Sequence, residues 1–394
     1  GAPRRPGTWR RPVSESPVPA PRGPGEPGGM VQLLTPEGRR VEHPGYEADL
    51  EPEELLALHR DMVLVRRIDT EATALQRQGE LGLWAGLLGQ EAAQVGSGRA
   101  MRPQDHAFPT YREHGVAWCR GVDPLGVLEL YRGTSHGGWD PVAHGFHPYT
   151  LVIAAQMLPA VGYAMGAQRD GAVGTGDPDR DTAVIAYLGD GATSQGEASE
   201  ALQWAAVYNA PLVVLCQNNQ WAISAPVSVQ ARVPLHRRAE GVGVPGVLVD
   251  GNDVLACLAV TRAALDRARS GGGPTFVEAL TYRMGAHTTS DDPSRYRSAA
   301  EVDLWRAKDP VERFRRYLLD EGILDAEHEA ALEAEGDELA ERLRAGVREL
   351  PEPGPLDMFD HAYAEPHAQV AEERDAFAAY LATFEDTATA GGKS

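Results

Sequence analysis

One stretch, residues 181–223, constrains the fold more than any other: DTAVIAYLGDGATSQGEASEALQWAAVYNAPLVVLCQNNQWAI. Two apolar runs, 182–188 and 212–216, flank a segment whose small apolar residues recur at helical spacing. Neither run alternates with polar residues, so each predicted strand must be covered on both faces. The stretch therefore predicts a parallel strand–helix–strand unit in an α/β sheet. We expect further strands over 247–253 and 274–282, with a helix between them.

The glycines of this stretch match neither of the two common nucleotide-binding motifs. In a GxGxxG fingerprint beginning at Gly189, the third glycine would stand where Ser194 is found. Gly191 and Gly196 have P-loop spacing, but Glu197 follows in place of the required lysine. The second strand also ends in amides, without the acid that would bind a ribose hydroxyl.

What remains is an acid after the first strand, Asp190, and an asparagine pair after the second, ending at Asn219. Ligands of open α/β sheets bind at the carboxyl ends of strands, so these two residues should lie together. Their oxygens suit Mg²⁺, which completes its shell with phosphate oxygens, and the N–H groups after Gly191 suit a diphosphate. GDG alone is more often an ordinary turn. Followed by NN about thirty residues later, it favours a Mg²⁺-diphosphate site.

With this spacing, GDGATSQGE and QNNQWAIS resemble the α subunit of the E1 component of 2-oxo acid dehydrogenase complexes. The similarity covers most of the chain and is closest in character to the branched-chain enzymes, then to the pyruvate enzymes. It implies a thiamine-diphosphate-binding α/β fold, with a parallel sheet flanked by helices. We expect a disordered Pro-, Gly- and Arg-rich tail over 1–45, the α/β domain over 46–300, and a helical extension over 301–394 that packs on the partner subunit.

The resemblance also implies the ligands of the metal and part of the cofactor site. Mg²⁺ would be bound by Asp190, by the Asn219 side chain and by the backbone carbonyl of Trp221, where the family usually has tyrosine. Because the ligand is a backbone carbonyl, the change from tyrosine to tryptophan does not remove it. The turn after the first strand would bind the cofactor through Gly189, Gly191 and Ala192.

Residues from other segments would complete the site by the same resemblance. Tyr111 and Arg112, within DHAFPTYREHG, would contact the cofactor diphosphate, for which the arginine fork is well suited. Ile153 would support the thiazolium ring. His287 aligns with the catalytic histidine; it would border the cofactor and give a proton to the departing lipoyl sulfur. By composition alone, these segments are ordinary loops or core.

Several positions depart from the family pattern or carry no assigned role. Ala154 and its neighbour lack the hydroxyl groups with which some relatives bind potassium. Gln217 stands where some relatives have arginine, so we assign it no role. Thr288 and Ser298 lie where mitochondrial relatives are phosphorylated, and nothing in the sequence indicates a kinase.

Three histidines lie in SHGGWDPVAHGFHPYT: His136, His144 and His147. Their spacing is irregular and no cysteine or acid completes a tetrahedral set, which argues against zinc. A wall of the active site is the better hypothesis, with the contributing histidine undetermined.

Composition limits the partners and the compartment. Lys and Arg number 37 against 57 Asp and Glu, a formal net charge of −20, which argues against nucleic acid and anionic membranes as partners. No apolar run is long enough to span a bilayer. Three cysteines form neither a CxxC motif nor an even disulfide set, and no signal-peptide pattern is present. We therefore expect a cytoplasmic protein.

The function implied by the resemblance is oxidative decarboxylation of a branched-chain 2-oxo acid of the 2-oxoisovalerate type. The acyl unit would pass to the lipoyl domain of E2, and the chain would form an α2β2 heterotetramer with an E1 β subunit that supplies a glutamate to the cofactor. A pyruvate enzyme and an acetoin-cleaving enzyme are alternatives. A non-catalytic Mg²⁺-diphosphate-binding subunit is another, against which the retention of Tyr111, Arg112 and His287 argues.

Overall fold

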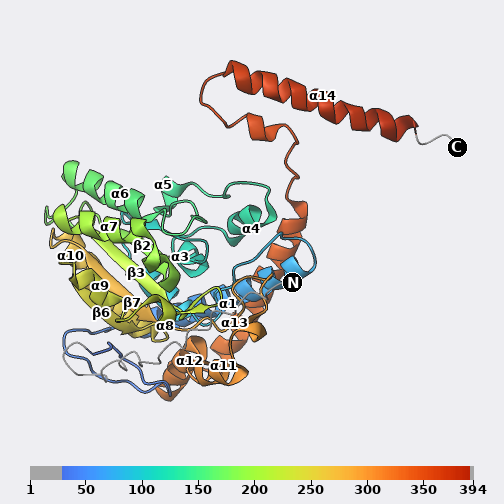
Figure 1. Cartoon of the computed structure of the whole chain (residues 1–394). Coiled ribbons are helices and arrows are strands. Elements are labelled where there is room, and N and C mark those ends of the chain that lie inside the picture. Colours follow the sequence, from blue (N-terminus) through green and yellow to red (C-terminus); the bar gives the residue numbers. More distant parts are fainter. Residues whose placement is uncertain (1–28, 391–394) are drawn as a thin grey trace, which may run out of the picture.

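A five-stranded sheet forms the centre of the computed structural model, which describes residues 29–390, with side chains to residue 384 (Figure 1). The strand order is β1-β2-β3-β7-β6 and every neighbouring pair is parallel. The strands are β1 (His106–Phe108), β2 (Val184–Gly189), β3 (Leu212–Asn218), β6 (Gly246–Asp250) and β7 (Thr275–Leu280). A small antiparallel pair follows β3: β4 (Trp221–Ala222) and β5 (Ala225–Pro226).

Helices cover both faces of the sheet (Figure 1). None in the described part of the chain is both long and apolar enough to cross a bilayer. The α-helices are α1 (Pro52–Arg77), α2 (Glu91–Ala100), α3 (His114–Cys119), α4 (Pro124–Arg132), α5 (Pro141–His144), α6 (Met157–Arg169), α7 (Gly196–Val207), α8 (Val227–Gln230), α9 (His236–Glu240), α10 (Val254–Arg269), α11 (Ala299–Arg306), α12 (Pro310–Asp320), α13 (Ala326–Glu349) and α14 (Ala368–Ala390). Short 3-10 turns are η1 (Asp190–Ser194), η2 (Pro293–Arg295) and η3 (Asp357–Phe359).

The predicted strand–helix–strand unit is confirmed as β2–α7–β3. Successive side chains of a strand point to opposite faces, and both faces are buried: Ile185 and Tyr187 join the core beneath α1, α2 and α10, while Val184 and Ala186 join the core beneath α6 and α7. Small residues such as Ala201 let α7 lie close to the sheet. The fold is the expected parallel α/β architecture.

Residues 29–45 do not belong to a disordered tail, so that prediction was wrong for this part of the chain. Leu33 and Leu34 are fully buried, and their backbone N–H groups donate to Asp253 Oδ2 at 2.7 and 2.6 Å. The physical reason is the short apolar run VQLL, which the Pro- and Gly-rich composition around it conceals. The first 28 residues, also predicted to be disordered, lie outside the described part of the chain.

The region after residue 300 is helical, as expected, but most of it is not an extension. Phe314 and Leu318 of α12 are buried in the same core as α1 and the sheet. The apolar residues over 302–318 are spaced as in one helix, but the chain breaks between α11 and α12 because Asp309 caps a new helix that begins at Pro310. Within the described residues, α14 and the segment that leads to it from the end of α13 stand away from the body (Figure 1).

Candidate active site

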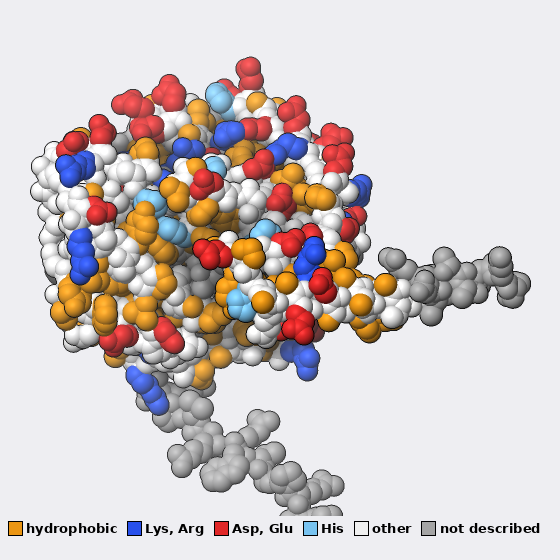
Figure 2. Space-filling view, turned by 90° about the horizontal axis from the view of Figure 1, so that it is seen from above, with side chains coloured by type: hydrophobic (Ala, Val, Ile, Leu, Met, Phe, Trp, Pro, Cys, Tyr) orange, Lys and Arg blue, Asp and Glu red, His pale blue; other side chains and the backbone are white. Residues whose placement is uncertain are grey.

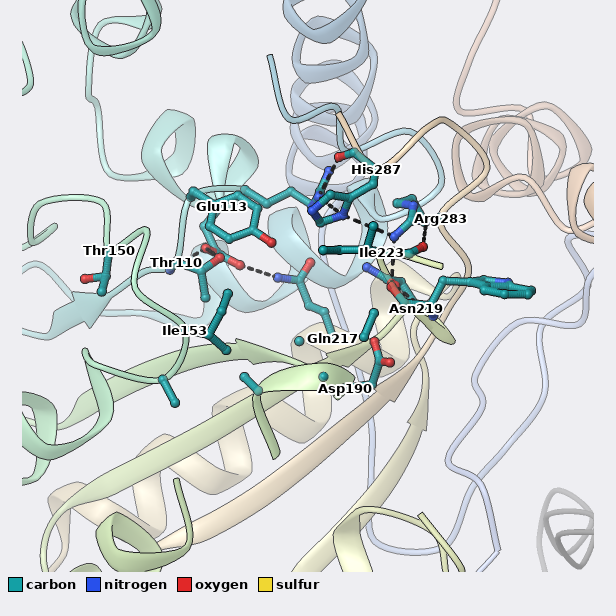
Figure 3. Close-up of a pocket in the computed structure, with 18 of the residues that line it drawn as sticks. Thr110, Glu113, Thr150, Ile153, Asp190, Gln217, Asn219, Ile223, Arg283 and His287 are labelled. Carbon is teal, nitrogen blue, oxygen red and sulfur yellow. Dashed lines mark hydrogen bonds between the residues drawn. The ribbon is translucent and has the colours of Figure 1, made fainter. Parts of the chain in front are cut away.

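A cavity of about 250 Å³ is lined by the residues that follow β2, β3 and β7 at their carboxyl ends. Loops from the first half of the chain close its other side (Figure 3). The structure brings together in this cavity every residue predicted to bind the cofactor or the metal: Tyr111, Arg112, Ile153, Gly189, Asp190, Gly191, Ala192, Asn219, Trp221 and His287.

Asp190 enters the cavity because β2 ends at Gly189 and the chain turns at once into η1. Its side chain is 2% exposed, and Oδ2 accepts a hydrogen bond from Gln230 Nε2 at 3.1 Å. Burial raises the pKa of this carboxyl to about 6, because the charged form loses hydration. A cation beside Asp190 would offset that cost.

Asn219 lies at the end of the neighbouring strand, and its amide faces the same cavity (Figure 3). Its Nδ2 donates to Gln90 Oε1 at 3.1 Å, while its Oδ1 accepts from the Trp221 N–H at 3.3 Å. The Trp221 carbonyl accepts from Arg283 Nη1 at 2.8 Å. A carbonyl oxygen has a second lone pair, so this bond leaves it able to bind a further partner.

Two backbone features shape the floor of the cavity. A Cβ on Gly191 would lie 2.6 Å from the Cβ of Ala222, so only glycine lets the turn after β2 approach β4 this closely. The backbone of Ala154 has a φ of +67°, a left-handed conformation that residues other than glycine rarely adopt. Such conformations cluster at functional sites, and this one directly follows Ile153.

Arg112 and His287 form the opposite wall. The Arg112 guanidinium donates from Nη1 to the Gly86 carbonyl and from Nη2 to the His287 carbonyl, the latter at 2.8 Å. Nη2 also lies 3.2 Å from His287 Nδ1, and Arg283 Nη1 lies 3.4 Å from the same atom. The Tyr111 ring meets the imidazole edge-on at 6.2 Å between centroids.

The electrostatics of His287 differ from the sequence expectation. The ordinary imidazole pKa near 6.5 was expected there, but burial lowers the pKa of His287 to about 4, with further lowering from Arg112 and Arg283. The imidazole is therefore neutral near pH 7. Neither guanidinium can accept a hydrogen bond, so Nδ1 must be the accepting nitrogen and Nε2 carries the proton.

Hydrogen bonds hold the segment 282–298, which by composition is an ordinary mobile loop. Asp291 Oδ2 accepts from the His287 N–H at 2.8 Å and from the Tyr296 hydroxyl at 2.5 Å. Arg297 donates from Nη2 to the carbonyls of Met284 and Gly285. These bonds fix the position of the imidazole.

Sequence reasoning missed a buried polar relay in the wall of the cavity. Gln94 Nε2 donates to Gln217 Oε1 at 3.0 Å, and Gln217 Nε2 donates to Glu113 Oε1 at 2.7 Å. Glu113 in turn accepts from the N–H and hydroxyl of Thr110. The relay fixes the loop that carries Arg112. Its members come from separate segments, and only the adjacency of Glu113 to Arg112 offered a signal.

The histidine-rich loop does not contribute to this site. Among the residues that line the cavity within 29–390, none is His136, His144 or His147. His144 Nδ1 lies 3.0 Å from the Arg120 carbonyl, and the His147 ring stacks on Phe108 at 3.8 Å. No group of three or more His, Cys, Asp or Glu that could hold a metal occurs in the described residues. The predicted contribution of one of these histidines to the active-site wall is not seen in this cavity.

A parallel α/β sheet whose carboxyl edge joins hard oxygen donors to arginines is typical of enzymes that bind phosphorylated ligands. The family model described as "Dehydrogenase E1 component" matches residues 59–355. The chain belongs to the dehydrogenase E1 component family. This family depends on thiamine diphosphate.

Relatives of the chain include α subunits of two kinds. It is 46% identical to the 3-methyl-2-oxobutanoate dehydrogenase subunit alpha of Mycobacterium tuberculosis (strain ATCC 25618 / H37Rv) over 353 residues, which is 89% of this chain and 94% of the relative. It is 37% identical to the pyruvate dehydrogenase E1 component subunit alpha of Acholeplasma laidlawii over 349 residues, 87% of this chain and 98% of the relative. The corresponding Staphylococcus aureus (strain N315) subunit is 37% identical over 321 residues, covering 81% and 82%.

Proposed function

We propose that this chain is the α subunit of a branched-chain 2-oxo acid dehydrogenase E1 component. It would act in the oxidative decarboxylation of a 2-oxo acid of the 3-methyl-2-oxobutanoate type and in acyl transfer to a lipoyl group of E2. The proposal rests on the observation that one cavity is lined by Asp190, Asn219, Arg112 and His287. The higher identity to a branched-chain relative, 46% against 37% for pyruvate relatives, supports the substrate class.

The cavity residues fit thiamine diphosphate and Mg²⁺. Asp190, Asn219 and the Trp221 carbonyl offer the hard oxygens that Mg²⁺ prefers. Gln90 Nε2 is buried without a hydrogen-bond partner among the described residues, as expected of a donor that awaits a ligand oxygen. When bound, thiamine diphosphate supplies the electron sink for decarboxylation.

The chain's own residues would bind and orient this cofactor. Arg112 and Tyr111 would hold the diphosphate, and the N–H groups of Gly191 and Ala192 would approach it closely because the turn carries no bulky side chain. Ile153 would support the ring system. Arg112 would thereby neutralise phosphate charge while still anchoring the loop of the catalytic histidine.

His287 would act as the proton donor to the departing lipoyl sulfur. Arg112 and Arg283 flank Nδ1 and leave the proton on Nε2, which is the atom that can donate. The hydrogen bond from the His287 backbone N–H to Asp291 holds the backbone that carries the ring, and the contacts of Arg112 and Arg283 at Nδ1 orient the ring itself. Because the ring is neutral at rest, the donating form would be the imidazolium, which takes up a proton from solvent and passes the Nε2 proton to the more basic thiolate.

E1 α subunits act with a β subunit and with E2, and we infer an α2β2 assembly here. Exposed apolar side chains favour it, including Val207 at 67% and Tyr208 at 51% exposure on α7 and its end. Figure 2 shows hydrophobic side chains grouped on the upper face and along the arm that leaves it. We propose that this arm, α14, packs on the partner subunit. The three cysteines are free thiols, which supports the cytoplasm as the compartment.

Reconstitution tests the proposal. The chain alone, the chain with its β subunit and the β subunit alone are assayed for decarboxylation of 3-methyl-2-oxobutanoate, pyruvate and acetoin, and for acylation of a lipoyl domain. We expect turnover only by the two chains together, with the highest kcat/KM for 3-methyl-2-oxobutanoate. Turnover by the chain alone refutes the two-subunit assignment, and preference for pyruvate or acetoin refutes the substrate class.

A further inference from the structure

The hairpin of β4 and β5 contains a residue in a conformation that its side chain disfavours. Ile223 and Ser224 form the two-residue loop between the two strands, and the backbone of Ile223 has a φ of +54°. Glycine or asparagine is usual where such a loop requires a positive φ. Four residues other than glycine have a positive φ in the described part of the chain, and Ile223 alone is β-branched; the others are Ala154, Asn209 and Gln220. For a β-branched residue this backbone conformation is a true outlier.

Arg283 holds the hairpin in this conformation. Its Nη2 donates to the Ile223 carbonyl at 2.7 Å, and its Nη1 donates to the Trp221 carbonyl at 2.8 Å. The same Nη1 lies 3.4 Å from His287 Nδ1, and the Arg283 side chain is almost fully buried. A disfavoured conformation persists where surrounding contacts of this kind determine it. One guanidinium therefore holds both the hairpin and the proposed proton donor.

The side chain of Ile223 contributes little to the packing of the chain itself. It is 56% exposed and is not part of the buried core. Glycine at this position would relieve the backbone strain and would lose little buried apolar surface. A strained residue that brings no packing gain of its own is typical of a functional site, where activity is retained at the expense of stability.

The position of Ile223 in the cavity indicates what it contacts. Ile153 and Ile223 are the two large aliphatic side chains among the described residues that line the cavity. Ile153 is assigned to the cofactor ring, which leaves Ile223 free. Figure 3 shows Ile223 next to Arg283 and His287. An apolar group of a ligand that reacts beside His287 would therefore meet Ile223 as its aliphatic contact.

We propose that Ile223 is a specificity-determining residue that contacts the alkyl group of the 2-oxo acid. This inference rests on the proposed function. The alkyl group of 3-methyl-2-oxobutanoate carries two methyl groups that pyruvate lacks, and the shorter acid would leave the Ile223 side chain without a partner. Apolar contacts of this size discriminate between substrates by about 10- to 200-fold.

Steady-state kinetics of the assembled enzyme test the contact. Ile223→Ala should lower kcat/KM for 3-methyl-2-oxobutanoate about tenfold or more and should change kcat/KM for pyruvate less than about twofold. Ile223→Val, which keeps a branched side chain, should retain most of the preference. Val229→Ala is the matched control, because Val229 is 61% exposed on the adjacent helix α8 and does not line the cavity.

Ile223→Gly separates this role from a structural one. The ratio of the two kcat/KM values should fall as it does for Ile223→Ala, while the melting temperature of the assembled enzyme should be unchanged or higher by up to about 3 °C. A structural role alone would change the melting temperature and leave the ratio as in the wild type. A lower melting temperature overturns the proposal, because the side chain is then needed for the fold or for assembly.

Calorimetry with thiamine diphosphate excludes a contact with the cofactor. Ile223→Ala should bind it as the wild type does, and a tenfold loss of affinity overturns the proposal. An unchanged substrate ratio in an active Ile223→Ala enzyme also overturns it, and the proposed function then still stands. A wild-type enzyme that prefers pyruvate, or that turns over neither acid, overturns the proposed function and this inference with it.

Discussion

Arg112 donates from Nη2 to the backbone carbonyl of His287 at 2.8 Å, and the same nitrogen lies 3.2 Å from the imidazole Nδ1. One guanidinium thus borders the cofactor cavity and also sets the position and tautomer of the histidine opposite. Cofactor binding and proton donation are expected to depend on this single side chain.

Arg112→Lys keeps the charge but removes the fork that reaches Gly86 and His287 together. We expect the Kd of thiamine diphosphate to rise about ten- to hundredfold, with a fall in kcat because His287 loses its anchor. Calorimetry and steady-state kinetics measure the two effects. Arg306→Lys, at a side chain 68% exposed, is the control. An unchanged Kd would show that Arg112 does not bind the diphosphate.

His287→Ala removes the proposed donor and leaves the metal-facing residues intact. Acylation of a lipoyl domain should fall about 10²- to 10⁴-fold, while cofactor affinity and decarboxylation with an artificial electron acceptor are largely kept. His328→Ala, at a half-exposed side chain, should change neither. If decarboxylation falls as steeply as acylation, His287 acts at an earlier step than the one assigned here.

Asp190→Asn removes a buried charge that only a cation would compensate. Mg²⁺-dependent cofactor binding should weaken about a hundredfold, since a hard anionic oxygen is lost. The metal-free protein should melt at a higher temperature than the wild type, because an isolated buried carboxylate is destabilising. Calorimetry and thermal unfolding without Mg²⁺ measure these opposite effects. A lower melting temperature together with unchanged binding contradicts the assignment.

Buried histidines should make the fold sensitive to acid. Burial lowers the pKa of His114 to about 3, and its ring stacks on Trp84 at 4.1 Å and bonds the Ala85 carbonyl. A base whose pKa is lower in the folded state stabilises the fold fully above its unfolded pKa, about 6.5, and this contribution falls as the pH drops towards the folded pKa.

His114→Gln should therefore lose less unfolding free energy between pH 7 and pH 4 than the wild type. The difference should be on the order of a few kcal/mol. Denaturant titrations of both proteins across this range measure it, and comparison with the wild type removes the contribution of the carboxyl groups. His328→Gln serves as the exposed control. Parallel stability curves for His114→Gln and the wild type would falsify this account of His114.

The sheet unit and the directly contacting residues were predictable because their signals are local. The unbroken apolar runs predicted β2 and β3, and the helix expected between the strands over 247–253 and 274–282 is α10 (Val254–Arg269). The family motifs added residues from distant loops such as Tyr111 and Ile153. Those motifs encode chemistry that contacts the ligand, which explains why the predicted set lies together.

The supporting residues could not be predicted, because their roles depend on contacts between distant segments. Gln90, Gln217 and Arg283 have no neighbours in sequence that mark them, and each reaches its hydrogen-bond partner only after the sheet and α2 assemble. The lowered pKa of His287 likewise follows first from burial and then from Arg112 and Arg283, and both the burial and the approach of Arg112 arise only in the folded chain. The break before α12 had a local signal, Asp309 followed by Pro310, that the apolar pattern around it hid.

Helix α14 and the segment before it leave the body of the molecule and carry Met358, Tyr363 and Tyr380 with more than half of each side chain exposed. When the chain is synthesised without a partner subunit, this exposed aromatic surface is free to associate non-specifically with other proteins. Recombinant production should therefore give aggregated material from this gene alone, and dispersed material when both subunits are translated together.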